Sequence, residues 1–95
     1  MARIGIKILD EDQDKWVFLV EVEDKGTKTE HKVTVNREFY ESLSKGACSP
    51  EEFVNKSFEF LLERESKESI LREFNISKIS YYFPEYIREI TKLIS

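Results

Sequence analysis

Three runs of alternating apolar and polar residues in the first part of the chain constrain its fold more than any other feature. The runs cover residues 4–8, 16–22 and 30–35. A period of two is typical of a strand that buries one of its faces. Short polar turns at residues 10–14 and 24–27 separate the runs. The sequence therefore predicts a three-stranded antiparallel meander, with the second strand in the middle.

The alternation also predicts which side chains lie inside. The inner face is expected to hold Ile4, Ile6, Ile8, Trp16, Phe18, Val20, Val22, Val33 and Val35. The opposite face is mainly charged, with Val17 and Leu19 as its apolar exceptions. An apolar patch on a polar face is typical of a protein contact, so Val17 and Leu19 are predicted partner contacts. The outer strands have free edges that can pair with a partner or with a second copy.

The hydrophobic period changes to that of a helix at Asn36, a good N-cap residue. The first helix is expected to end at Gly46 in the left-handed conformation. The sequence Ser49-Pro50-Glu51-Glu52 then forms a capping box that opens a helix reaching about residue 65.

Further helices are expected after that point. Ser66 or Lys67 is predicted to open one that ends at Asn75, and a short turn of helix starting at residues 76–79 stops before Pro84. A last helix follows Pro84. The predicted fold class is α+β, a three-stranded antiparallel β-meander followed by three to four helices packed on one face, in a single domain of residues 1–95.

Composition restricts the partners and the compartment. The net charge is −4 and is spread evenly, whereas a protein that wraps nucleic acid usually has a basic face. The single cysteine, Cys48, forms no internal disulfide, which suits a reducing cytoplasm. The longest uncharged apolar run, Trp16 to Val20, is far shorter than a membrane span. We expect a cytoplasmic protein with no membrane-bound segment.

Each residue pattern that would carry chemistry also has a simpler structural explanation. Asp10, Asp12, Asp14 and Glu21 have the spacing of a calcium loop, but Lys15 stands where that loop needs glycine. An acidic hairpin turn is the preferred interpretation. His31 lacks cysteine or histidine partners at metal-ligand spacing and is interpreted as the end of the core stripe.

Cys48 precedes a helix N-terminus that could lower its pKa, but no general base is identifiable beside it, so an inert thiol is preferred. We predict no catalytic residue, no metal site and no cofactor.

The segment at residues 67–83 offers a nucleic-acid hypothesis. Residues 74–78 look like the turn of a helix-turn-helix, and residues 76–84 resemble the recognition helix of tetracycline-repressor-like regulators. This resemblance implies DNA contacts by Lys78, Ser80 and Tyr81. The alternative is that Tyr81, Tyr82 and Phe83 pack a helical corner onto the sheet.

Two broader resemblances concern most of the chain. Residues 58–65, 68–74 and 82–86 look like a group of short, functionally uncharacterised prokaryotic proteins, which implies no activity and no site residue. Three strands followed by a helix are similar, in element order alone, to HicB-like antitoxins. The function predicted first is a non-enzymatic protein-interaction or small regulatory protein, and a homodimer is one form that it can take. A DNA-binding regulator or an antitoxin-like protein is the alternative.

Overall fold

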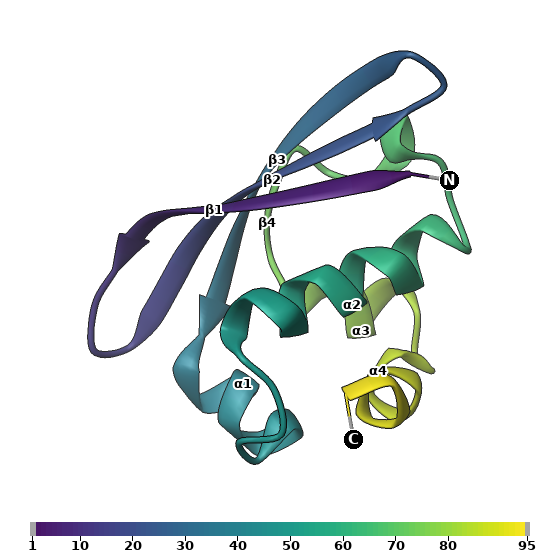
Figure 1. Cartoon of the computed structure of the whole chain (residues 1–95). Coiled ribbons are helices and arrows are strands. Elements are labelled where there is room, and N and C mark those ends of the chain that lie inside the picture. Colours follow the sequence, from purple (N-terminus) through teal and green to yellow (C-terminus); the bar gives the residue numbers. More distant parts are fainter. Residues whose placement is uncertain (1, 95) are drawn as a thin grey trace.

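The computed structural model describes residues 2–94, and residues 3–36 form most of a twisted sheet (Figure 1). The strands are β1 (Arg3–Glu11), β2 (Lys15–Asp24), β3 (Thr27–Asn36) and β4 (Glu73–Asn75). They lie in the order β1-β2-β3-β4, with β1, β2 and β3 antiparallel and β4 parallel to β3. The predicted α+β class and antiparallel meander are confirmed. The prediction of three strands is wrong, because β4 joins the sheet from the second half of the chain.

The hairpin between β2 and β3 has a two-residue loop. Lys25 and Gly26 have φ angles of 54° and 79°. Two consecutive positive φ angles define a type I′ turn, whose twist matches that of the flanking strands. This turn fixes the register at Asp24 opposite Thr27, and it thereby sets which side chains of both strands face inward.

The inner face of the sheet follows the predicted alternation except at one residue. The side chains of Trp16, Phe18, Val20, Val22, Val33 and Val35 are buried. Ile4 and Ile6 are partly buried, whereas Ile8 is 45% exposed. The prediction for Ile8 is wrong because this residue lies on an edge strand, beside a register shift. There the end of β1 reaches past the helices (Figure 1).

The helices form further layers below the sheet (Figure 1). They are α1 (Arg37–Ser44), α2 (Pro50–Leu62), α3 (Lys78–Tyr82) and α4 (Tyr86–Ile94), with a 3₁₀ turn, η1 (Lys67–Ser69), between α2 and β4. α2 packs against β1, and α4 packs against α2. α2 is therefore enclosed between the sheet and α4, and six of its side chains are buried.

The residues predicted to begin or end helices do so in some cases and not in others. Ser49 caps α2, because its Oγ accepts a hydrogen bond from the Glu52 N–H at 3.1 Å. Asn36 does precede α1, but its side chain does not cap the helix. Its Oδ1 instead accepts a hydrogen bond from Asn75 Nδ2 at 2.6 Å, so it ties β3 to the end of β4. Gly46 is left-handed as predicted, and so is Lys45.

The helix predicted from Ser66 or Lys67 to Asn75 is wrong. After η1 the chain is extended at Ile70 and then forms β4. Two main-chain hydrogen bonds hold this segment to β3, from Lys32 N to Arg72 O at 2.7 Å and from Ile76 N to Thr34 O at 2.9 Å. Pairing with a strand about 40 residues earlier therefore replaced the local helix, because tertiary contacts override local propensity.

Candidate functional site

The free edge of the sheet is the first candidate site, and the hydrogen bonds of β3 show how it is built. The main-chain groups of Lys32 and Thr34 form their hydrogen bonds with the β4 segment. In an antiparallel ladder the two main-chain polar groups of a residue point to the same side, and this side alternates along the strand. Val33 therefore bonds to its partner Phe18 in β2. It follows that the main-chain N–H and C=O groups of Leu19 point toward β1, where its partner is Lys7.

The same alternation fixes the direction of every main-chain group in β1. Gly5 and Lys7 bond to β2, so Ile4, Ile6 and Ile8 direct their N–H and C=O groups away from the sheet. No strand of the described chain lies beyond β1. The main-chain N–H and C=O groups of these three isoleucines are thus unpaired along the free edge. Their side chains lie on the inner face of the sheet.

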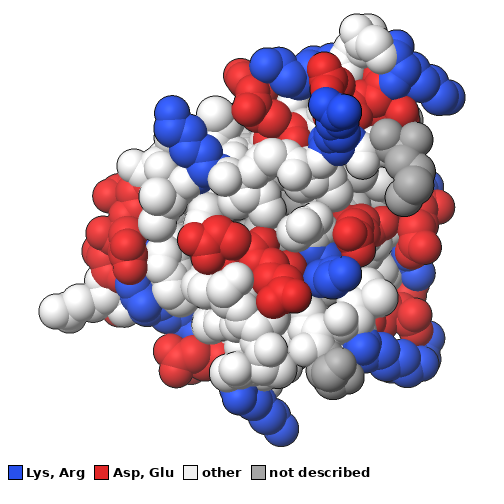
Figure 2. Space-filling model, viewed as in Figure 1, with Lys and Arg blue, Asp and Glu red and all other residues white. Residues whose placement is uncertain are grey.

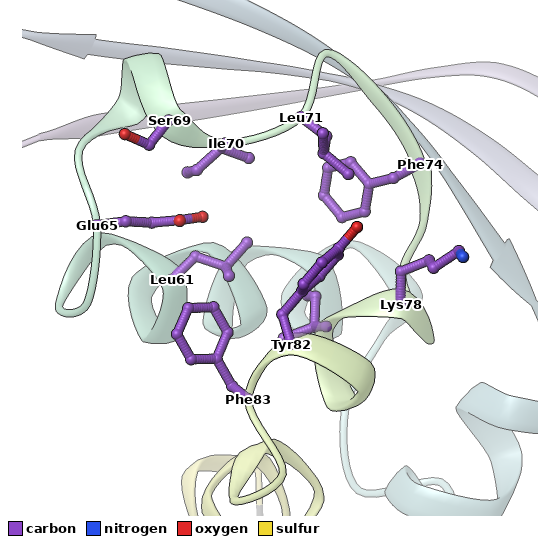
Figure 3. A pocket seen from close by; sticks show the side chains of 10 residues that line it. Leu61, Glu65, Ser69, Ile70, Leu71, Phe74, Lys78, Tyr82 and Phe83 are labelled. Carbon is purple, nitrogen blue, oxygen red and sulfur yellow. The ribbon is translucent and has the colours of Figure 1, made fainter.

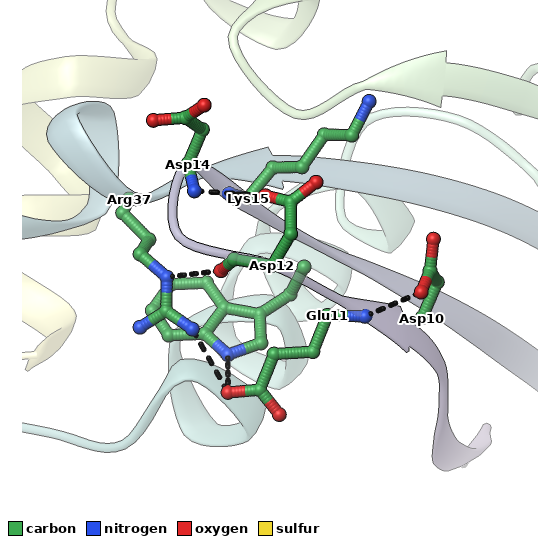
Figure 4. Close-up of polar contacts among 7 residues, drawn as sticks. Asp10, Glu11, Asp12, Asp14, Lys15 and Arg37 are labelled. Carbon is green, nitrogen blue, oxygen red and sulfur yellow. Dashed lines mark hydrogen bonds and ion pairs between the residues drawn. The ribbon is translucent and has the colours of Figure 1, made fainter.

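The far end of this edge is closed by a bulge and a polar cluster (Figure 4). The register shifts between Ile8 and Asp10, so the regular ladder is interrupted there and pairing with β2 resumes only at Asp10 and Glu11. Arg37 then holds the end of β1, because its Nη2 lies 2.8 Å from Glu11 Oε2 and its Nε donates to Asp12 O at 2.8 Å. The accessible edge is therefore restricted to the part of β1 before the bulge.

The outer face of the sheet holds the predicted partner contacts. Val17 is only 8% exposed, and Leu19 is half-buried. Leu19 lies between Lys7 and Lys32 in the register, and the aliphatic stems of such lysines can cover apolar surface. The outer face exposes less apolar surface at Val17 and Leu19 than the sequence indicated. Contact with a partner there stays a prediction.

The second candidate site is a cavity of about 290 Å³ between the end of α2, the segment at residues 65–74 and α3 (Figure 3). Its walls are mostly apolar. They include Leu61, Ile70, Leu71, Phe74, Tyr82 and Phe83. Leu71 and Tyr82 are largely exposed at its rim, so the cavity opens to the surface. Sequence reasoning missed this site because it expected a helix in place of η1 and β4.

One carboxylate stands in the wall of this cavity. Glu65 extends between Ile70 and Leu61 toward the interior of the cavity, whereas the amino group of Lys78 points away from it (Figure 3). Burial raises the pKa of the Glu65 carboxyl group. Within residues 2–94, no hydrogen bond or ion pair reaches this carboxylate.

The residues predicted to contact DNA lie together on α3 but not in a helix-turn-helix. Lys78 is exposed, with its Nζ 5.4 Å from the centre of the Tyr81 ring, and Ser80 Oγ donates to Ser77 O at 2.8 Å. Tyr81 is 79% exposed. Residues 67–83 form a 3₁₀ turn, a strand and one five-residue helix. The DNA hypothesis therefore lacks the pair of helices on which it was based.

The alternative interpretation was that three aromatic residues pack a helical corner onto the sheet. It is wrong for two of the three. Tyr81 and Tyr82 do not pack onto the sheet, because both side chains are largely exposed. Phe83 is partly buried, with its ring 5.9 Å from that of Phe60 in α2.

The sequence also singled out two isolated residues, His31 and Cys48. His31 is fully buried, as predicted for the end of the core stripe. Its Nδ1 lies 2.8 Å from Leu71 O and its Nε2 lies 2.8 Å from Thr29 Oγ1. Burial, and then the nearby charge of Glu52, raise the pKa of the Cys48 thiol. The Cys48 carbonyl accepts a hydrogen bond from the Tyr40 hydroxyl.

The acidic turn between β1 and β2 directs one carboxylate at its own backbone. Asp12 Oδ1 accepts from the N–H groups of Asp14 and Lys15 at 2.8 and 2.9 Å. These bonds lower the Asp12 pKa. Across residues 2–94, no three His, Cys, Asp or Glu side chains meet in an arrangement that would hold a metal ion.

Charges of both signs are mixed on the surface seen in Figure 2, which shows no continuous basic field. Each helix of the described chain is too short or too polar to serve as a membrane span. Comparisons with protein-family models, curated proteins and solved structures find no match for this chain.

Proposed function

We propose that this chain is a non-enzymatic interaction protein that works as a homodimer, joined through the free edge of β1. The observation that carries the proposal is the row of unpaired main-chain groups at Ile4, Ile6 and Ile8. An exposed strand edge is a ready template for a further strand. The part of β1 before the bulge carries neither proline nor an inward-facing charge that would block pairing.

A second copy fits this edge because β1 is complementary to itself. Antiparallel pairing about Ile6 places Ile6 opposite Ile6 of the other copy and Ile4 opposite Ile8. All three pairs use the outward-facing backbone groups, so they contribute about six main-chain hydrogen bonds. The side chains of these pairs form a continuous isoleucine ladder on the inner face. This ladder covers the exposed surface of Ile8.

Charge selects this register over its neighbours. A register centred on Gly5 places Arg3 opposite Lys7 of the other copy, and one centred on Lys7 places the two lysines opposite each other. Like charges directly opposite each other destabilise a strand pair. The register centred on Ile6 places Lys7 opposite Gly5 instead. It is therefore the register that pairs all three isoleucines without opposing two cations.

Sedimentation velocity over a wide concentration range tests the proposal. Strand pairing alone buries less than the ~1,600 Å² of a standard interface, so we expect a reversible dimer. Ile6→Pro removes an N–H that makes no bond within the chain, and it should give a folded monomer. Lys7→Pro is the matched control, because it removes a bond to β2 and should destabilise the fold. A wild-type chain that stays monomeric at every concentration would contradict the proposal.

Cysteine cross-linking in a Cys48→Ser background tests the register. Paired residues with Cα atoms about 5.5 Å apart lie within disulfide reach. Ile6→Cys should cross-link to itself, and a mixture of Ile4→Cys and Ile8→Cys chains should give mainly the mixed dimer. Cross-links between Ile4→Cys and Ile6→Cys, or between Ile6→Cys and Ile8→Cys, would show a different register.

A further inference from the structure

We propose that the cavity between α2, β4 and α3 binds a small organic cation with an apolar body, and that Glu65 pairs with its charge. This proposal is independent of β1, because no residue of that strand lines the cavity. A volume of about 290 Å³ is near the lower limit for ligand sites, so it suits one ring with a short chain.

The walls determine the body of the ligand. Phe74 and Phe83 stand on different sides of the cavity, with Tyr82 at its mouth (Figure 3). Aromatic walls favour an aromatic or branched aliphatic group, and they also attract a cation through the ring faces. Leu61 and Ile70 complete the apolar surroundings beside Glu65.

The charge of the ligand follows from the lack of a partner for Glu65. Three basic side chains around this segment are engaged elsewhere. Arg64 Nε lies 3.0 Å from Glu85 Oε2, Lys67 Nζ lies 2.8 Å from Glu68 Oε2, and Lys78 lies over the Tyr81 ring. A partly desolvated carboxylate without a partner gains most from a hydrogen-bonding cation. The same carboxylate repels an anionic ligand.

The test is an NMR titration of the folded chain with 2-phenylethylammonium, with 2-phenylethanol as the uncharged probe of similar shape. The ammonium probe should shift the amide signals of Ile70, Leu71 and Phe74 in a saturable manner. The alcohol should bind about tenfold more weakly, because it cannot form the charged hydrogen bond.

Two variants test whether Glu65 is the residue that pairs with the ammonium group. Glu65→Gln should weaken binding of the ammonium probe about tenfold and leave binding of the alcohol unchanged. Glu59→Gln, at an exposed position of α2 outside the cavity, should leave both unchanged. The monomeric Ile6→Pro chain should still bind the probe, so failure of the dimer proposal would not remove this one. The proposal is overturned if the wild-type chain shows no saturable shifts, if the alcohol binds as tightly as the ammonium, or if Glu65→Gln binds like the wild type.

Discussion

At the scale of single residues, His31 makes the stability of the fold depend on pH. A carbonyl oxygen only accepts hydrogen bonds, so Nδ1 donates to Leu71 O and Nε2 accepts from the Thr29 hydroxyl. The bond at Nε2 requires the neutral ring, because a protonated ring has no acceptor nitrogen, whereas the bond at Nδ1 forms in either state. Burial, and then the charge of Arg72, lower the His31 pKa below its ordinary value of 6.5.

This lowered pKa predicts that acid destabilises the protein before its carboxylates titrate. Below about pH 6.5 the unfolded chain takes up a proton that folded His31 resists. Stability is therefore complete above that pH and falls as the pH drops through the folded pKa. Denaturation midpoints between about pH 7.5 and pH 5 should show this fall, and His31→Gln should flatten it. A His31 ring whose NMR signals titrate at or above pH 6.5 would contradict the prediction.

Tyr86 and Ser57 predict an asymmetric response to mutation. Ser57 Oγ donates to Phe53 O at 2.8 Å and lies 2.7 Å from the buried Tyr86 hydroxyl, so it accepts from Tyr86. Tyr86→Phe removes one hydrogen bond and should lower the free energy of unfolding by about 1 kcal/mol. Ser57→Ala strands a buried hydroxyl and should cost more, up to about 3 kcal/mol. Urea unfolding of both variants measures the difference, and the reverse order would disprove this assignment of donor and acceptor.

At the scale of elements, the start of α2 depends on one side chain. Ser49→Ala removes the acceptor for the Glu52 N–H and should lower the free energy of unfolding by about 1 kcal/mol. Ser49→Gly should cost only a few tenths of a kcal/mol, because glycine suits the extended backbone of the N-cap position. Equal losses in urea unfolding of the two variants would show that the hydroxyl makes no net contribution.

β1 predicts an alternating pattern of amide exchange. In dilute protein the amides of Gly5 and Lys7 should exchange slowly, because they bond to β2, whereas those of Ile4, Ile6 and Ile8 should exchange quickly. At high concentration the isoleucine amides should become protected. The Ile6→Pro chain serves as the control, since its exchange should not depend on concentration. Uniform protection along β1 at low concentration would contradict the derived main-chain directions.

Elements with local signals were predictable, and β4 was not. The alternation in β1, β2 and β3 and the Ser49 cap each operate within a few residues of sequence. Glu73–Asn75 is too short to show a period, and its partner Lys32–Thr34 lies about 40 residues earlier. Ile70, Leu71 and Phe74 also match helical spacing, so the local pattern favoured the wrong element. The cavity depends on this segment, which is why sequence reasoning missed both together.

At the scale of the whole molecule, the radius of gyration distinguishes a monomer from a dimer. The Cα radius of gyration is 12.4 Å, close to the value of about 12.4 Å expected for a compact chain of this length. Joining two copies at their β1 edges places their centres side by side. Small-angle X-ray scattering should therefore give a radius that rises with concentration, whereas Ile6→Pro should keep the monomer value. A radius that stays constant for the wild-type chain would contradict assembly through this edge.

Trp16 gives the molecule an internal optical reporter. It is the single tryptophan, its Nε1 donates to Glu11 Oε2 at 3.2 Å, and the Arg37 guanidinium lies 4.0 Å from its ring centre. Its ring also meets that of Tyr40 edge to face. One indole therefore touches both arms of the first hairpin and the beginning of α1. Its emission spectrum should record in one signal whether these three segments separate together or in sequence when the protein is denatured.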